Sequence, residues 1–378
     1  MKNLAVFYGG KSVEHDISII TALQVMNNVD KSKYNLIPIY IHTDNHWYIL
    51  DDYKNLNIYA NCILKGKTLA TGFYNGYLLH KKHFGFKEYK KIDIVINCCH
   101  GLNGEDGTLS GLLELNNIPY VGSGVVASAV GMDKAIMKDV FVANNIPCVK
   151  YFTFKKIQFE EDNENTILLA EQKLKYPIIV KPANLGSSIG INISQNREEL
   201  IKNIEIALKF DEKIVLEQVV PNLREINCSV IGNTKTCEAS ILEEPKNWTT
   251  FLDFDEKYIK ANENKKTLNV KLEKELEAHI KELSKQVFKL LGCNGIVRID
   301  YLLNDKTKDV YVNEINTIPG SFANYLWTHK YNFSQLIDIL ISKAESEYLY
   351  KNAYTYSYKS QVLSNFKNCQ KTTKLNKL

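Results

Sequence analysis

The sequence predicts an α/β and α+β protein with more than one domain, and three observations lead to this prediction. The chain has 378 residues, enough for two or three domains of ~100–200 residues each. It opens with an apolar run, two glycines and a helical pattern, the order found in doubly wound α/β domains. Much later, β-branched and aromatic runs at 296–303 and 309–316 flank a polar turn, which predicts a β-hairpin.

Composition and charge exclude several classes of protein. Apolar residues make up 45% and charged residues 24%, which is ordinary for a globular protein, and no run of 18 uncharged apolar residues predicts a membrane span. The net charge is +4, but residues 351–378 hold six lysines and no acidic residue, so the rest is slightly acidic, unlike a nucleic-acid binder. The eight cysteines form no CxxC pair, and no secretory segment precedes the first predicted strand. We therefore expect free thiols in the cytoplasm and neither a nucleic-acid nor a membrane partner.

The first third of the chain follows the pattern of alternating strands and helices. A strand at 4–8 ends at two glycines, and apolar residues then recur at helical spacing over 17–26. The GxGxxG fingerprint is absent, so no dinucleotide site is expected. Residues 35–41 and 92–97 predict further strands, the latter buried and parallel, whereas 43–91 is expected to be irregular with short strands.

Two stretches before residue 191 suggest ligand contacts. His100 follows the predicted strand 92–97, at the strand end where open α/β sheets bind ligands, although a structural loop histidine is the simpler alternative. A helix is predicted at 132–145 with Lys134 near its start. Lys181 leads from a predicted strand into the Gly/Ser loop 182–190, whose backbone N–H groups could approach a phosphate. The loop is not a Walker motif and alone is a weak signal.

The remaining elements are predicted from periodicity. Glu217 lies inside the apolar run 215–220, where it could accept hydrogen bonds from a nucleotide, but an exposed strand edge is the favoured interpretation. The polar, aromatic stretch 251–266 has the length of a lid loop. Other predicted elements are strands at 226–231 and 239–242, a helix at 271–291 ending at Gly292, a last helix at 333–344, and a flexible tail or small addition at 345–378.

The predicted hairpin carries the strongest sign of a metal site. Side chains alternate along a strand, so Arg298 and Asp300 share one face, as do Glu314 and Asn316 on the returning strand. If the faces coincide, two carboxylates, an amide oxygen and a guanidinium converge, and Mg²⁺ prefers such oxygen ligands together with substrate phosphates. The alternative is a solvated hairpin with a structural Arg–Asp pair. That alternative must also explain both strands and the Gly-containing turn 318–320.

Eight motifs, in order over residues 1–344, resemble the D-alanine–D-alanine ligases of the ATP-grasp superfamily. They are YGGKSVEHDIS, HGLNGEDGTLSGLLE, YVGSGVVASAVGMDK, VKPANLGSSIGI, VLEQVV with REINCSV, FLDFDEKY, GIVRIDYLL and VNEINTIPG. The resemblance implies a Rossmann-like N-terminal domain at 1–122 and a two-part ATP-grasp fold at 123–215 and 216–344. The tail, 345–378, is basic and of unknown role.

The resemblance also implies an activity and its partners. ATP would drive the ligation of two D-alanines through an acyl phosphate, for peptidoglycan precursors, with two Mg²⁺ ions or Mn²⁺ in their place. A cytoplasmic homodimer is expected. A relative that joins D-alanine to another acceptor such as D-serine, or an inactive ATP-binding regulator, is the alternative; the intact lysines and metal ligands argue against the regulator.

The motif positions imply a role for each site residue. ATP would contact Lys134, Lys181, Ser188 and Lys257 near its phosphates, Glu217, Gln218 and Val220 at the adenine, and Glu225 at the ribose. The metal ions would bind Asp300, Glu314 and Asn316. The first D-alanine would meet Glu14 with His100 nearby, Ser187 and Tyr258 would hydrogen-bond Glu14, and Arg298 with the Gly320 N–H would stabilise the oxyanion.

The acceptor subsite departs from the family pattern. The family has a serine–leucine pair whose serine holds the acceptor carboxylate, and a gap-free count places Tyr325 and Leu326 there. Ser321 or Asn324 could substitute, and Tyr325 could instead pack beside Phe322 and Trp327. The stretch Glu256-Lys257-Tyr258, in which Lys257 would reach the acceptor or phosphate, matches dipeptide-forming members better than the D-lactate-using branch.

Overall fold

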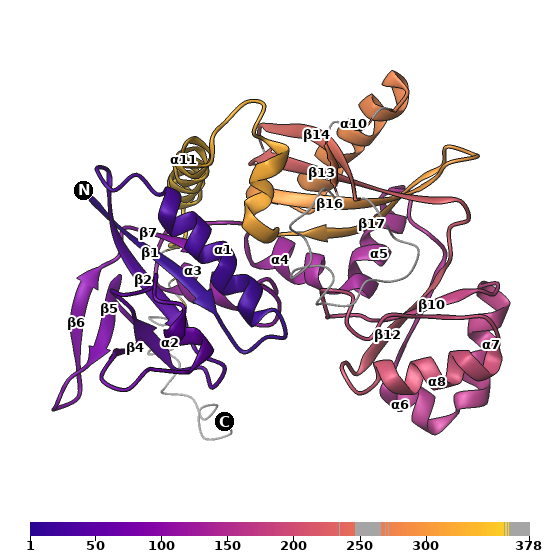
Figure 1. Ribbon diagram of the computed structural model, residues 1–378, viewed down its shortest axis with the longest axis horizontal. Helices are drawn as coiled ribbons and strands as arrows, with labels where there is room; N and C mark the ends of the chain where they lie inside the picture. Colours follow the sequence, from indigo (N-terminus) through magenta and orange to yellow (C-terminus); the bar gives the residue numbers. More distant parts are fainter. Residues whose placement is uncertain are drawn as a thin grey trace.

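The computed structural model describes residues 1–233, 235–245, 266–268, 270, 272–358, 360 and 362. Three β-sheets and their helices form the molecule, with the first sheet at one end and the second in a separate lobe at the other (Figure 1). Their strand orders are β6-β5-β4-β3-β2-β1-β7-β8, β11-β10-β12-β9 and β15-β14-β13-β16-β17.

The first sheet is parallel in its centre and antiparallel at one side. β1 (Lys2–Gly9) pairs in parallel with β2 (Tyr34–Ile41) and β7 (Ile94–Asn97), and β7 pairs in parallel with β8 (Tyr120–Val121). The buried parallel strand predicted at 92–97 is therefore present. The stretch expected to be irregular adds four antiparallel strands, β3 (Trp47–Ile49), β4 (Thr68–Tyr74), β5 (Tyr77–Lys81) and β6 (Phe86–Lys91), and α2 (Asn57–Ala60).

Helices cover both faces of this sheet. Leu4, Val6 and Tyr8 of β1 pack in one cluster with α1 (His15–Asn28) and α11 (Phe333–Asn352). Ala5 and Phe7 point the other way and pack with α3 (Thr108–Leu115). The alternation of side chains along the strand thus places β1 in the centre of a three-layer core.

The second sheet is antiparallel and packs three helices on one face, while α5 (Lys134–Ala143) lies against the other. Its strands are β9 (Tyr151–Lys155), β10 (Ile178–Pro182), β11 (Asn192–Ser194) and β12 (Lys213–Gln218), and its helices are α6 (Lys156–Glu161), α7 (Asn163–Lys173) and α8 (Arg197–Ala207). Ile214 and Leu216 of β12 join the core under these helices. Val215 and Glu217 therefore lie on the opposite face, toward α5.

The third sheet contains the predicted hairpin. β16 (Gly295–Asn304) pairs with β17 (Val310–Asn316), so the hairpin prediction is confirmed. The other strands are β13 (Leu223–Gly232), β14 (Cys237–Pro245) and β15 (Lys266–Leu268), and the covering helices are α4 (Val125–Met132), α5 (Lys134–Ala143) and α10 (Lys274–Leu290). Gly292 follows α10 with φ +67°, the left-handed conformation that glycine adopts readily, and so the helix ends where predicted.

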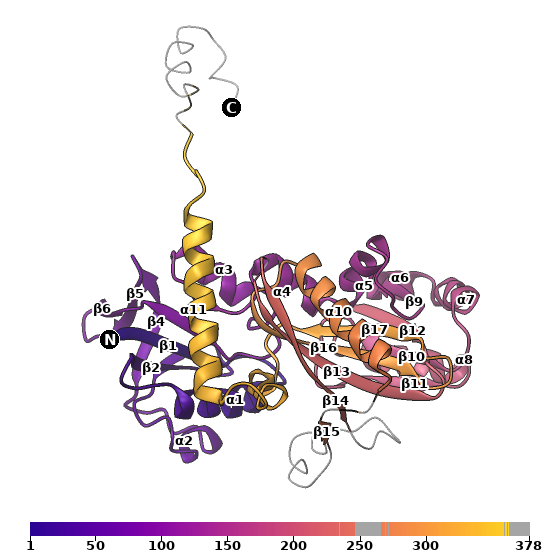
Figure 2. The ribbon, with the colours of Figure 1, turned by 90° about the horizontal axis from the view of Figure 1, so that it is seen from above.

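The last helix corrects one prediction. α11 runs from Phe333 to Asn352, so residues 345–352, expected to belong to a flexible tail, are helical and extend along the N-terminal part of the molecule (Figure 2). Few apolar residues mark these turns, and the helix was therefore predicted too short. The expected boundary at 215/216 falls inside β12, and the domain boundaries stay predictions. Within the described ranges, no helix is both long and apolar enough to cross a membrane.

Candidate active site

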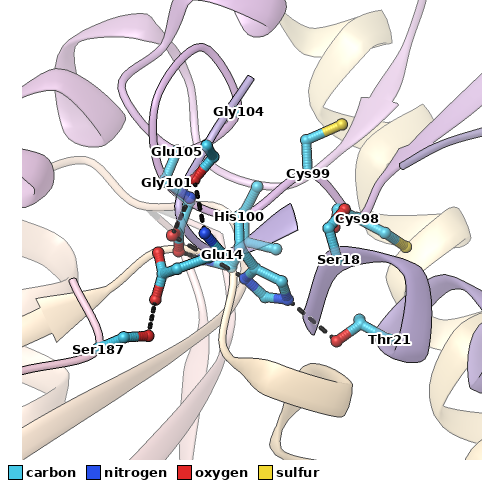
Figure 3. Close-up of polar contacts among 12 residues, drawn as sticks. Glu14, Ser18, Thr21, Cys98, Cys99, His100, Gly101, Gly104, Glu105 and Ser187 are labelled. Carbon is cyan, nitrogen blue, oxygen red and sulfur yellow. Dashed lines mark hydrogen bonds and ion pairs between the residues drawn. The ribbon is translucent and has the colours of Figure 1, made fainter. Parts of the chain in front are cut away.

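The predicted site residues gather where loops of all three sheets meet. Because β1 and β7 are parallel neighbours, their carboxyl ends lie at one edge, and this brings Glu14 and His100 together (Figure 3). The Gly/Ser loop between β10 and β11 reaches this edge through Ser187, as the dashed contact in Figure 3 shows. The segment after β17 also reaches it, since the Ser321 N–H donates to Thr21 Oγ1 at 3.2 Å.

Glu14 is the point at which the N-terminal part meets the Gly/Ser loop. The Ser187 hydroxyl donates to Glu14 Oε1, so this expected contact is present. A Cβ on Gly186 would lie 2.8 Å from both carboxylate oxygens, and one on Gly101 would lie 3.0 Å from Oε2. A Cβ at either position would therefore displace the Glu14 carboxylate, and at Gly101 the φ of +70° also favours glycine. Tyr258, the other expected partner, lies outside the described residues.

His100 is a buried, neutral histidine. Its Nε2 lies 3.0 Å from Thr21 Oγ1, and its Nδ1 lies 3.9 Å from Glu105 Oε2. Burial, together with the charge of Arg298, lowers the pKa of His100 to about 4. The imidazole is consequently uncharged at neutral pH, and it orients the Thr21 hydroxyl that accepts the Ser321 N–H.

Glu105 is a site residue to which sequence reasoning gave no role. Its carboxyl accepts the Gly101 N–H at 2.8 Å and the Ile318 N–H at 3.2 Å, which joins the loop after β7 to the segment after β17. Burial first, and then the charge of Glu14, raise the pKa of Glu105 to about 8. Its place between two glycines in the turn 104–107 was the available signal.

The hairpin residues converge as predicted. Asp300 lies opposite Glu314 and Arg298 lies opposite Asn316 in the β16–β17 register. The Arg298 Nε and Nη2 groups donate to the two Asp300 oxygens at 2.7 Å each, and Asn316 Nδ2 donates to Asp300 Oδ2 at 3.1 Å. Lys134 adds an ammonium 3.5 Å from Glu314 Oε2.

These residues fit a hard divalent cation by their chemistry. Asp300, Glu314 and Asn316 offer two carboxylates and an amide, all of which supply the oxygen ligands that Mg²⁺ prefers. Asn316 would have to present Oδ1, whereas its Nδ2 now faces Asp300. No group of three His, Cys, Asp or Glu side chains that could hold a metal occurs among the described residues. Mg²⁺ usually keeps several waters and binds substrate phosphates as well as carboxylates, so a phosphate or water would complete its coordination.

A buried cluster of charges lies under the Gly/Ser loop. Lys181 Nζ donates to Glu217 Oε2 at 2.7 Å and to Asn313 Oδ1 at 3.2 Å, and Lys138 Nζ lies 3.0 Å from Glu217 Oε1. The favoured interpretation of Glu217 as an exposed edge residue was wrong: its side chain is buried, and β12 lies between β10 and β9. The apolar run was compatible with either position, and only the strand order decides between them.

The remaining expected nucleotide residues lie on or beside β12 and β13. Gln218 bonds the backbone of Lys175 through both ends of its side-chain amide, at 2.8 Å each, and its own N–H donates to the Lys150 carbonyl at 2.9 Å. Val220 is buried, and Glu225 lies opposite Leu302. Lys134 Nζ donates to the Leu185 carbonyl at 2.8 Å, and Ser188 is in the same Gly/Ser loop. Lys257 lies outside the described residues.

The expected acceptor segment folds as a short 3-10 helix, η1 (Gly320–Leu326). Ser321, Phe322 and Ala323 have φ between 45° and 52°, and Phe322, Leu326 and Trp327 are buried. The Tyr325 hydroxyl donates to Glu243 Oε2 at 2.9 Å. A phenol has one O–H to donate, and this geometry favours the packing alternative for Tyr325 over contact with an acceptor carboxylate.

Comparisons with known proteins point to one family over almost the whole chain. The model described as "D-ala D-ala ligase N-terminus" matches residues 3–123, and "D-ala D-ala ligase C-terminus" matches residues 140–342. A D-alanine–D-alanine ligase of Thermosipho melanesiensis is 41% identical over 90% of this chain and 93% of its own length. One of Staphylococcus epidermidis is 37% identical over 94% of this chain and 99% of its own.

Solved structures agree in the fold. The D-alanine–D-alanine ligase of Coxiella burnetii superposes with a TM-score of 0.78 at 27% identity, covering 98% of this chain and 99% of that one. The D-Ala:D-Ser ligase of Enterococcus faecalis gives 0.77 at 30% identity, covering 91% and 99%. The predicted fold class, a Rossmann-like domain followed by an ATP-grasp fold, is confirmed.

Proposed function

This chain belongs to the D-alanine–D-alanine ligase family, and we propose that it joins two D-alanines to D-alanyl-D-alanine with ATP, for peptidoglycan precursors. The observation that carries the proposal is the Ser187–Glu14 contact, which ties the Gly/Ser loop to the N-terminal sheet. This contact brings a carboxylate suited to an ammonium group close to a loop suited to phosphates. A ligase that activates an amino acid with ATP needs both in one place.

The nucleotide is expected between the second and third sheets. Lys134 and Lys181, from different elements, face this space and supply positive charge for the phosphates. Glu217 and the backbone around Gln218 would meet the adenine, and Glu225 the ribose. Mg²⁺ ions, held by Asp300, Glu314 and Asn316, would neutralise charge on the phosphates during transfer.

The first chemical step needs orientation more than acid–base catalysis. Glu14 would bind the ammonium of the first D-alanine and so aim its carboxylate at the γ-phosphorus of ATP. One carboxylate oxygen bonds to phosphorus as the bond from phosphorus to the ADP oxygen breaks, which gives D-alanyl phosphate and ADP. Lys134 and Lys181 favour this step because they offset the negative charges that are brought together.

The second step forms the peptide bond. The amino group of the second D-alanine, after losing a proton, attacks the acyl carbon, and phosphate leaves with the electrons of the broken carbon–oxygen bond. Arg298, fixed by its two bonds to Asp300, and the N–H of Gly320 would stabilise the oxyanion. His100, being neutral, adds no competing positive charge beside the substrate ammonium.

An acceptor screen tests the proposal. Purified protein, ATP, Mg²⁺ and D-alanine are incubated alone or with D-serine or D-lactate, and phosphate release and product mass are measured. The expected main product is D-alanyl-D-alanine. A mixed product with D-serine as the main species would support the alternative acceptor, and ATP binding without turnover on any acceptor would support a regulator.

We also propose that the protein works as a cytoplasmic homodimer. The seven cysteines among the described residues are free thiols, as suits a reducing compartment. An apolar surface on α3 and α4, formed by Leu115, Val125 and Val126, is exposed, with Leu115 88% and Val126 72% accessible. Apolar side chains grouped on adjacent helices are typical of a subunit interface.

A further inference from the structure

A fully buried lysine beside the nucleotide site has no role in the mechanism above. Lys138 projects from α5, is 0% exposed, and places Nζ 3.0 Å from Glu217 Oε1. Lys181 approaches the same carboxylate from β10 and donates to Oε2 at 2.7 Å. Two ammonium groups therefore share one buried carboxylate.

The two lysines differ in what they can reach. Lys181 is at the start of the Gly/Ser loop and already contacts Asn313 of β17 across the space between the sheets. Lys138 is enclosed by α5, β12 and the Tyr151 ring, whose centroid lies 6.0 Å from its Nζ. Lys138 is thus a fixed counter-ion, whereas Lys181 is close enough to the site to turn toward a ligand.

The carboxylate retains an acceptor that the protein does not use. Neither Glu217 Oε1 nor Lys138 Nζ has a hydrogen-bond partner among the described residues, since their close pair lacks the necessary alignment. Burial would raise the pKa of Glu217, but Lys138 and Lys181 outweigh it and lower the pKa to about 2. A buried carboxylate that lost both cations would be strongly disfavoured, so one of them has to stay.

We propose that Lys138 is a positioning residue for the nucleotide, which keeps Glu217 ionised and in place while Lys181 turns to the phosphates. Glu217 Oε1 then accepts a hydrogen bond from the 6-amino group of adenine. This inference rests on the proposed function, in which Glu217 contacts the base. An ionised carboxylate accepts hydrogen bonds and donates none, so the arrangement selects a base with an amino group at that position.

Nucleotide binding without amino acids tests this inference, because no turnover occurs. Calorimetry compares ATP with purine riboside triphosphate, which lacks the 6-amino group. The wild-type protein is expected to prefer ATP about tenfold or more, the effect of one hydrogen bond to a charged group. Lys138→Met should lose ATP affinity by about tenfold or more and most of this preference. Lys138→Arg, which keeps the charge, should retain most of both, and Lys156→Met on an exposed helix is the matched control.

A double-mutant cycle separates positioning from general destabilisation. In a Glu217→Gln background, Lys138→Met should add little further loss of ATP affinity, since Lys138 acts through Glu217. The double variant removes Lys138 together with Glu217 and leaves Lys181 its contact with Asn313, so it serves if the single Lys138→Met protein does not fold. Two results would overturn the role of Lys138. One is a further loss of about tenfold in ATP affinity when Lys138→Met is added to Glu217→Gln. The other is wild-type ATP binding by Lys138→Met while Glu217→Gln loses the preference for ATP. An unchanged ATP preference in Glu217→Gln would overturn the adenine contact itself.

Discussion

Burial and neighbouring charges set the pKa values of the ionisable residues in the candidate site. His100 and Glu105 are both buried and lie 3.9 Å apart at their closest nitrogen and oxygen, yet burial moves their pKa values in opposite directions, to about 4 and about 8. Both shifts favour the uncharged form, as desolvation requires. Burial opposes the charge on Arg298, but the charge of Asp300 and two short hydrogen bonds to it hold the pKa of Arg298 above its ordinary value.

The buried histidine predicts a loss of stability in acid. The folded-state pKa of His100, about 4, lies below its ordinary value of 6.5, so the unfolded chain binds a proton first as the pH falls. Stability from this group is present above pH 6.5 and is lost as the pH falls toward 4, by up to ~3 kcal/mol. His100→Gln should therefore lose less stability between pH 7 and pH 4.5 than wild type, measured by urea unfolding. Equal losses in both proteins would contradict the shift.

The metal assignment predicts a specific loss in Glu314→Gln. An amide is a poorer ligand than a carboxylate for hard Mg²⁺, and the charge stabilisation lost at the transition state is worth several kcal/mol. We expect ligation to fall about a hundredfold or more with a nearly unchanged thermal melt. Asp309→Asn, an exposed carboxylate just before β17, is the control and should remain active. Near-normal turnover of Glu314→Gln at saturating Mg²⁺ would disprove the assignment.

Substitution of Tyr325 tests whether this residue stabilises the fold or contacts the acceptor substrate. Its hydroxyl donates to Glu243, which is 1% exposed, and removal of that donor is expected to destabilise the fold by ~1–3 kcal/mol. Tyr325→Phe should lower the melting temperature while leaving the acceptor KM within about twofold, whereas Ser321→Ala should raise the acceptor KM. An increased acceptor KM for Tyr325→Phe without a loss of stability would restore the gap-free placement of the family's serine.

Elements with strong local patterns were predictable and those without them were not. The β16–β17 hairpin has apolar strands on each side of a polar turn, and α10 has an apolar stripe that ends at a glycine, so both were found. β6, which is a mostly exposed edge strand, and the last two turns of α11 lack such a pattern. The Glu217 environment depends on strand order, which local sequence does not encode.

Because α11 extends to Asn352, truncations that begin at residue 351 and at residue 345 are expected to have different effects on stability. Removal of residues 351–378 ends the chain within the last turn of α11 and is expected to leave ligation within about twofold, because the predicted site residues lie earlier in the chain. Removal of residues 345–378 also deletes the half-buried Tyr348 and should lower the melting temperature. Scanning calorimetry and phosphate release on both truncations check this. A large loss of activity in the shorter deletion, with the melt preserved, would place the tail at the site.

At the scale of the whole molecule, the site exists only when three sheets are assembled. Glu14 comes from the first, Lys181 and Glu217 from the second, and Arg298 from the third. The Ser187–Glu14, Glu105–Ile318 and Ser321–Thr21 contacts join them. Sequence motifs identified most of these residues, but the Glu105 link could not be predicted, because it pairs a side chain with a backbone N–H 213 residues away.

The apolar surface on α3 and α4 predicts the oligomeric state. If Leu115, Val125 and Val126 meet the same surface of a second copy, a twofold dimer covers them, and the protein should have twice the monomer mass at micromolar concentration. Leu115→Glu and Val126→Glu should each shift the mass toward the monomer in light scattering, because a buried, unpaired carboxylate is strongly disfavoured. Leu168→Glu, equally a leucine exposed on a helix but in the second lobe, should leave the dimer intact. Dissociation of the dimer by Leu168→Glu instead would place the interface elsewhere. A monomeric wild-type protein would disprove the dimer.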